Sequence, residues 1–167
     1  MTNGRLLVVV DESPATKRAA TYVAKIVGRQ RNLRISLAHL LPRFPAHLLE
    51  FRGAEDPHEE VRLNRRLKRD QQQWMVGAKK KAQRALGMAT ATLRRGGVSA
   101  HALDIQLSEV VEGLGAAERI LQLARARRCN TVVVGRGSVS WFQELMRDTL
   151  AEDLVRRGKG YTIWVVE

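Results

Sequence analysis

Hydrophobic and polar residues alternate along the chain in blocks that predict strands and helices in turn. The runs at 5–11 and 131–135 are apolar almost throughout, which is typical of strands buried on both faces of a parallel sheet. Between such runs, apolar residues recur every three or four positions, as they do on one face of an amphipathic helix. The pattern predicts five strands, RLLVVVD (5–11), RISLAHLLP (34–42), GGVSAHALDIQ with its turn (96–106), NTVVVG (130–135) and YTIWVVE (161–167).

Four helical segments separate these strands. The first is expected to begin with Ser13 as its N-cap and Pro14 in its first turn, and to end near Gly28. The third is expected within 113–129, and the fourth after the glycine turn that follows Gly135. The inward faces of the first and third helices are predicted to carry Thr16, Ala20, Val23, Val27, Ala117, Ile120, Leu121 and Ala124.

The second helical segment is long and polar. It follows an irregular stretch at 43–57, and one apolar stripe runs through it from about His58 to Arg95. Gly77 and Gly87 fall inside this helix, and a break there is left open because glycine disfavours helix interiors. The stripe consists of Leu63, Leu67, Trp74, Ala78, Ala82, Leu86, Ala89 and Leu93.

The alternation of strands and helices predicts an α/β fold. We expect a single open, doubly wound sheet of five parallel strands in the order 3-2-1-4-5, with helices on both faces. Residues 1–167 then form one domain, with an irregular insertion and a long basic helix at about 43–95. In such sheets a ligand lies beyond the carboxyl ends of the strands where the strand order reverses. That location corresponds to DES (11–13) and GRGSVS (135–140).

Composition narrows the class of protein. Hydrophobic residues make up 44% and charged residues 28%, which is ordinary for a globular domain, but the net charge of +12 indicates a very basic surface or an anionic partner. The single cysteine, Cys129, excludes an internal disulfide and fits a reducing cytosol. Neither a signal peptide nor a membrane span is predicted, so we expect a cytoplasmic protein.

Two stretches carry a resemblance to a known family. LLVVVDESPATKRAATYVAKIV at 6–27 and NTVVVGRGSVSWFQELMRDTLAEDLVRRGKGYTIWVVE at 130–167 resemble the universal stress protein family, within the adenine-nucleotide-binding α/β hydrolase-like superfamily. AHLL at 38–41 is similar to the end of that family's second strand. The resemblance implies an open α/β domain, dimerisation, a role in stress response, and either adenine-nucleotide binding or none. It implies no established enzymatic reaction.

The nucleotide motif of the family is degenerate in this sequence. Members that bind nucleotide carry G-x-x-G-x9-G-[S/T], and this spacing from Gly135 reaches Ser138, Asp148 and Thr149. Only the first glycine and the final hydroxyl residue match, although Gly137 lies one position before the second glycine. A carboxylate about 4 Å from a phosphate charge costs about 4 kcal/mol at an effective dielectric of about 20. We therefore expect a weak or lost site for AMP or ATP, with Mg²⁺ only alongside ATP, and AMP less disfavoured.

Each candidate site residue also has a structural interpretation. Asp11 suits a turn or a helix cap, Ser13 suits an N-cap, and Leu40 suits a strand core, although its backbone matches the position that contacts adenine in the family. The two glycines suit a strand-to-helix turn, and Thr149 suits a hydrogen bond within its helix. The candidate site residues are Val10, Asp11, Ser13, Leu40, Gly135, Arg136, Gly137, Ser138 and Thr149.

The charge of the long helix leaves a second function open. RLNRRLKRD (62–70) and KKKAQRALGMATATLRR (79–95) carry much of the excess positive charge. These residues form either a solvated helix face or a surface through which a basic α/β adaptor binds nucleic acid or another polyanion. The sequence shows no spacing typical of a metal site or a catalytic triad, weak ATP hydrolysis stays open, and Cys129 is expected to be a packing residue.

The last predicted strand lies at the sheet edge in this strand order. Ile163 and Val165 would face one side and Trp164 and Val166 the other, so the edge is apolar on both faces and invites pairing. The resemblance implies that this edge meets its twin across a twofold axis. We therefore expect a homodimer through 161–167, with Trp164 near the interface or under the last helix; the alternative is a monomer whose edge is capped by helices.

Overall fold

The structure is a computed structural model that describes residues 4–28, 30, 32–50, 53, 55–108, 113–137 and 150–167. Five parallel strands form one sheet in the order β3-β2-β1-β4-β5, which confirms the predicted fold class and strand order. The strands are β1 (Arg5–Val10), β2 (Arg34–Leu40), β3 (Leu103–Ser108), β4 (Thr131–Gly135) and β5 (Thr162–Val166).

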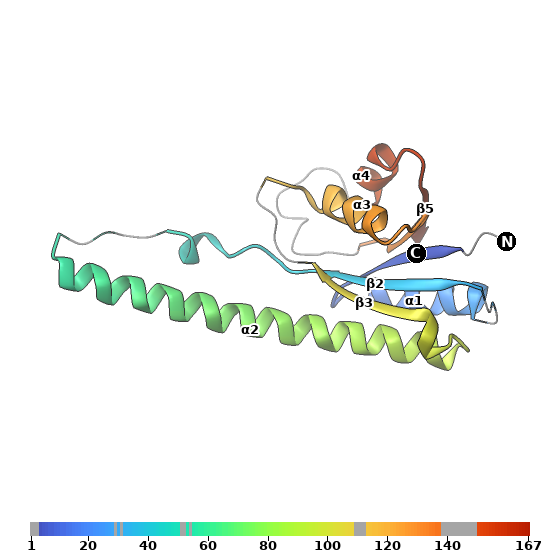
Figure 1. Ribbon diagram of the computed structural model, residues 1–167, viewed down its shortest axis with the longest axis horizontal. Helices are drawn as coiled ribbons and strands as arrows, with labels where there is room; N and C mark the ends of the chain where they lie inside the picture. Colours follow the sequence, from blue (N-terminus) through green and yellow to red (C-terminus); the bar gives the residue numbers. More distant parts are fainter. Residues whose placement is uncertain are drawn as a thin grey trace.

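Helices cover both faces of this sheet, as Figure 1 shows. On one face lie α1 (Pro14–Val27) and α2 (Pro57–Arg95), and on the other lie α3 (Ala116–Ala126) and α4 (Leu150–Arg157). Two short 3₁₀ turns, η1 (Ala46–Leu48) and η2 (Ala100–Ala102), complete the elements of the described chain.

Two hydrophobic cores follow from the pleat of the central strand. Leu6 and Val8 of β1 pack toward α1 and α2, whereas Leu7 and Val9 pack toward α3 and α4. Because β1 is covered on both faces, its apolar run has no polar alternation, as predicted. The inward residues predicted for α1 and α3 are all buried except Leu121, which is half-buried.

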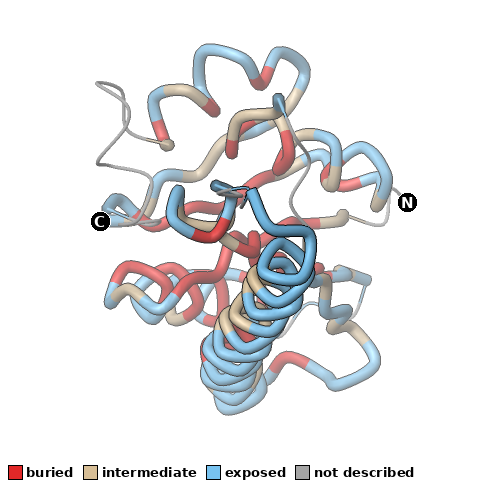
Figure 2. Tube along the Cα trace, turned by 90° about the vertical axis from the view of Figure 1, so that its left-hand side faces the viewer, coloured by how far each residue is buried: buried red, intermediate tan, exposed pale blue. Residues whose placement is uncertain are grey.

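The long helix α2 is continuous through Gly77 and Gly87. Its buried residues begin at Ala82, and the part before them extends well past the sheet (Figure 1) and is exposed nearly all round (Figure 2). The expectation that Trp74 lies on a core stripe is therefore wrong. Trp74 is half-buried outside both cores, with its ring centroid 5.1 Å from that of Phe44.

The edge strand β5 is less buried than the strands beside it. Val165 is 37% exposed, whereas Ile163 packs against the α3–α4 core. Trp164 packs against the α1–α2 core, and its ring meets that of Tyr22 edge-on at 6.0 Å. The helix under Trp164 is therefore α1 and not the last helix, because alternate residues of a strand face opposite sides of the sheet.

Candidate functional site

The carboxyl ends of β1 and β4 meet where the strand order reverses. The two strands pair in parallel from Leu6 opposite Thr131 to Val8 opposite Val133, so both end at the same edge of the sheet. The loop after Val10 and the turn after Gly135 therefore lie side by side, and the Arg18 Nη2 donates to the Arg136 carbonyl across them at 3.3 Å. This is the location that the strand order predicts for a ligand.

Asp11 is buried in the turn between β1 and α1. Its Oδ1 accepts hydrogen bonds from the Ser13 amide at 2.9 Å, from the Ser13 hydroxyl, and from the Thr16 hydroxyl at 2.7 Å. The Asp11 amide donates to the Thr16 Oγ1 at 2.8 Å. These contacts give Asp11 a structural role in holding the start of α1, as its structural interpretation proposed.

Ser13 occupies the N-cap position of α1, with extended backbone angles of φ −77° and ψ 156°. Its hydroxyl makes no capping bond to a helix amide and instead donates to Asp11. The position of the N-cap was predicted, but its side-chain hydrogen bond was not. The hydroxyl groups of Ser13 and Thr16 thus converge on one carboxylate oxygen.

The two glycines of the turn have different physical roles. Gly135 is buried, and a Cβ there would lie 2.6 Å from the Ala15 carbonyl oxygen, so glycine allows the first turn of α1 to approach β4. Gly137 is exposed, adopts a φ of +81°, and has no atom of the described residues within 4 Å of a Cβ built on it. Of these two glycines, Gly137 is therefore the one that combines a left-handed backbone with space that the described residues leave open.

Arg136 lies between these glycines and is directed toward the end of the chain. Its guanidinium pairs with the Glu167 carboxylate, and its amide donates to the Val166 carbonyl at 2.7 Å. Both side chains are largely exposed, so the pair adds little stability and the guanidinium can exchange Glu167 for another anion. Arg136 thus supplies a cation at the mouth of the candidate site.

Leu40 is buried in the α3–α4 core, so its side chain serves packing and only its backbone could meet a ligand. Its neighbour His39 lies opposite Val10 in the sheet register and is 1% exposed. The His39 Nε2 is 3.5 Å from the Glu12 Oε1, and neither ring nitrogen makes a hydrogen bond with the described residues. Burial lowers the pKa of His39, and the nearby carboxylates of Glu12 and Asp11 oppose that shift.

Arg119 is a second buried polar residue at this edge. From α3, its Nη1 and Nη2 each donate to the Leu41 carbonyl at 3.3 Å, and its Nη2 donates to the Ser108 carbonyl at 3.2 Å. Burial and the charge of Arg43 lower the pKa of Arg119. It therefore joins the carboxyl ends of β2 and β3.

Sequence reasoning did not single out His39 or Arg119. Arg119 follows Ala116 by three residues, so it falls within the inward stripe of α3, and a charge on an inward stripe is the signal that could have identified it. His39 stands within the apolar run of β2, which offers the same signal.

The second half of the degenerate motif falls outside the described residues. Ser138 and Thr149, with Asp148 between them, belong to that part of the chain, so their expected roles stay predictions. Cys129 is buried in the α3–α4 core, where burial raises the pKa of its thiol, which suits a packing residue. The described residues contain no group of three or more His, Cys, Asp or Glu arranged to hold a metal ion. Within the same residues, none of the helices is long and apolar enough to cross a membrane.

Comparisons with known proteins agree with this architecture. Similar solved structures include a universal stress family protein from Burkholderia pseudomallei, at 20% identity and a TM-score of 0.61, covering 98% of this chain and 96% of that chain. A universal stress protein from Archaeoglobus fulgidus in complex with dAMP is 15% identical with a TM-score of 0.56, over 100% of both chains. A universal stress protein in complex with cAMP is 15% identical with a TM-score of 0.62, covering 98% of this chain and 97% of that chain. At these identities the structures show the fold alone.

The family itself is established by sequence. No curated protein matches the chain significantly. The family model described as "Universal stress protein family", however, matches residues 2–161. Because this match spans nearly the whole sequence, the chain belongs to the universal stress protein family.

Proposed function

We propose that this chain is a non-enzymatic regulatory protein of the stress response with a weak adenine-nucleotide site between the loop after Val10 and the turn at Gly137. The observation that carries the proposal is the juxtaposition of these two segments where the strand order reverses. Two solved family members similar in fold are complexes with dAMP and cAMP, which each have one phosphate. A cytoplasmic location, suggested by the single cysteine and the family, is part of the proposal.

The contacts of the described residues favour weak binding. The Asp11 Oδ1 already accepts several hydrogen bonds, and Ala15 fills the space beside Gly135. The described residues leave open the space beside Gly137, where an exposed main chain can approach a phosphate. A single phosphate there needs fewer favourable contacts than a triphosphate, so we expect AMP to bind better than ATP. Mg²⁺ is expected only together with ATP.

A nucleotide screen tests this function. Protein freed of nucleotide is titrated calorimetrically with AMP, with ADP and with ATP plus Mg²⁺, and mass analysis identifies anything retained through purification. The expected result is binding of AMP that is tighter than binding of ATP. Absence of binding to all three nucleotides would overturn the nucleotide site, and tighter binding of ATP would overturn the expected preference.

The Gly137→Ala variant tests where the nucleotide binds. Alanine at a φ of +81° is strained by about 1 kcal/mol and brings a side chain toward the proposed phosphate position, so we expect AMP affinity to fall about tenfold. Gly160→Ala is the matched control, because Gly160 has a φ of +85°, equally open surroundings, and a position before β5 at the opposite edge of the sheet. Both variants should lose similar stability, measured by urea unfolding. Equal AMP affinities in the two variants would show that the phosphate does not bind at this turn.

We further propose that the protein is a homodimer built on the edge strand β5 and its flanking residues, Tyr161–Glu167. Val165 is 37% exposed on a strand that has one hydrogen-bonded neighbour, and an antiparallel pair of identical edges satisfies twofold symmetry. Val165→Lys places a charge on this edge and should convert the dimer to a monomer, as light scattering at micromolar concentrations would detect. Val155→Lys, at a 60% exposed position of α4, is the control that should remain dimeric. A monomeric native chain, or a dimeric Val165→Lys variant, would contradict this interface.

A further inference from the structure

The two helical layers of the protein differ in charge. The helices α1 and α2 together contain fourteen lysines and arginines but only three carboxylates. The helices α3 and α4 together contain four arginines and three carboxylates. The net charge of +12 is therefore concentrated on the α1–α2 side of the sheet. Neither α1 nor the part of α2 from Gln71 to Arg95 contains a carboxylate.

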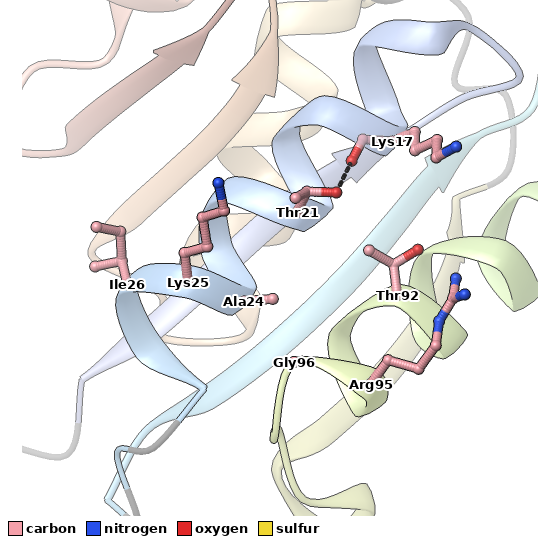
Figure 3. Close-up of a pocket in the computed structure, with 8 residues that line it drawn as sticks. All are labelled: Lys17, Thr21, Ala24, Lys25, Ile26, Thr92, Arg95 and Gly96. Atoms are coloured by element: carbon pink, nitrogen blue, oxygen red, sulfur yellow. Dashed lines mark hydrogen bonds between the residues drawn. The ribbon is translucent and has the colours of Figure 1, made fainter.

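A groove of about 700 Å³ lies between these two helices (Figure 3). Lys17 and Lys25 extend from α1, and Arg95 extends from α2, so cations stand on both walls. All three side chains are exposed. The remaining lining residues are Thr21, Ala24, Ile26, Thr92 and Gly96.

The groove cations have no acidic partner among the described residues. The ion pairs of that part of the chain involve other cations, such as Arg62, Arg127 and Arg157. The Arg95 Nε makes one long contact, 3.4 Å, with the carbonyl oxygen of Ala91 one turn earlier. The three cations are therefore available for an external anion at no loss of an ion pair within the described chain.

The cationic wall continues along α2. Arg84 and Lys81 precede Arg95 by eleven and fourteen residues, which are close to three and four helical turns, so the three share one side of the helix. At 1.5 Å per residue the row spans about 21 Å. Duplex DNA carries one charge per about 1.7 Å of its axis, so a duplex laid along this row carries about a dozen phosphates over that length, and the row meets those on the near side.

We propose that the α1–α2 groove binds the phosphate backbone of duplex nucleic acid without reading its sequence. Cations without carboxylates, arranged along two parallel walls, complement a ridge of phosphates. The groove lining contains no aromatic side chain on which an unpaired base could stack, which favours a duplex over a single strand. A lipid surface fits less well, because α2 buries Leu86 and Leu93 against the sheet and, from Ala82 to Arg95, exposes only Met88 as a large apolar side chain, which is too small an apolar face to enter a bilayer.

The test compares two variants that lose the same charge. Lys17→Gln, Lys25→Gln and Arg95→Gln together neutralise the groove, and Arg34→Gln, Arg125→Gln and Lys159→Gln together neutralise exposed cations outside α1 and α2. The probe is a fluorescent DNA duplex of about 20 base pairs, titrated by anisotropy between about 50 and 200 mM salt. Parallel titrations use the single strand and vesicles of anionic lipid, and urea unfolding measures the stability of each variant.

We expect the native chain to bind the duplex more tightly than the single strand or the vesicles. The groove variant should bind the duplex at least about tenfold more weakly, with a salt slope reduced by about 2 to 3, and the control should change far less. Equal losses of duplex affinity in the two variants would show that the net charge of the protein, and not the groove, accounts for binding. Tighter binding to vesicles or to single strands than to the duplex would show that the partner is not duplex nucleic acid. A groove variant that loses stability while keeping duplex affinity would show that Lys25 and Arg95 serve only the helix ends.

Discussion

The two halves of α2 continue one apolar stripe into two different environments. The carboxyl-terminal half buries Ala82, Leu86 and Leu93, with other residues of the same face, against the sheet. The amino-terminal half, which begins at Pro57, has no buried residue. Periodicity therefore determines which face of a helix is apolar, but the reach of the sheet determines how far along the helix that face is covered.

The amino-terminal half of α2, before Ala82, is called the free half below, and the half from Ala82 onward the packed half. The free half depends on local contacts. The Asp56 carboxylate caps it by accepting from the His58 amide at 3.0 Å, an interaction worth about 1 kcal/mol. The Gln71 Nε2 donates to the Leu48 carbonyl at 2.7 Å, which ties the helix to the irregular segment before it. Because most helical stability in proteins comes from packing of an apolar face, the free half relies on these contacts and on its continuity with the packed half.

The largest expected effect is on the free energy of unfolding, when one leucine is truncated in each half of α2. Leu93 is fully buried, so Leu93→Ala should lower the free energy of unfolding by about 2 to 5 kcal/mol through lost burial and a cavity. Leu67 is half-buried outside both cores, so Leu67→Ala should lower it by about 1 kcal/mol or less. Urea unfolding of both variants measures the difference. Comparable losses would mean that a partner, such as a second copy, covers the free half in solution.

Acid should lower the stability of the packed region of the protein, where His39 is buried. Burial keeps the pKa of His39 below its ordinary value, so the unfolded chain takes up a proton first as the pH falls through about 6.5. Stability is then fully present above that pH and declines below it, by at most about 1.4 kcal/mol per pH unit for one proton.

The His39→Gln variant checks this dependence. Urea unfolding followed from about pH 7.5 to about pH 5.5 should show a shallower decline than in the native chain. His58→Gln is the control for loss of an imidazole, since His58 is exposed in the first turn of α2, outside both cores. Identical pH profiles for the native chain and His39→Gln would show that His39 is not the titrating group.

The elements and their order were predictable because they depend on local patterns. The apolar runs of β1 and β4 and the steps of three and four in α1 identify buried strands and an amphipathic helix without tertiary information. Trp74 was misplaced for the opposite reason. Its packing depends on Phe44, thirty positions earlier, and on where the sheet ends.

The juxtaposition of the two segments of the candidate site was predictable, but their contacts were not. The strand-order reversal identified the segments at Asp11 and Gly135, because that rule concerns topology alone. Whether Asp11 faces a ligand or a turn depends on Ser13 and Thr16, and a sequence pattern does not give the direction of those hydroxyl groups. Arg119 was missed because the carbonyl groups that accept from it belong to Leu41, just after β2, and to Ser108, the last residue of β3, which are both distant in sequence.

The smallest effect tests whether the two halves of α2 unfold together. Gly77 and Gly87 are both exposed, and a Cβ added at either would meet no atom of the described residues within 4 Å; alanine favours a helix over glycine by about 1 kcal/mol. Gly87 lies among the buried residues of the packed half, so Gly87→Ala should raise the free energy of global unfolding by about 0.5 to 1 kcal/mol. Gly77 lies before that half begins, so Gly77→Ala should raise it by less than about 0.5 kcal/mol and instead slow amide hydrogen exchange in the free half. Equal gains in urea unfolding would show that α2 unfolds as one cooperative unit, because the alanine at position 77 would then stabilise the same transition as the alanine at position 87.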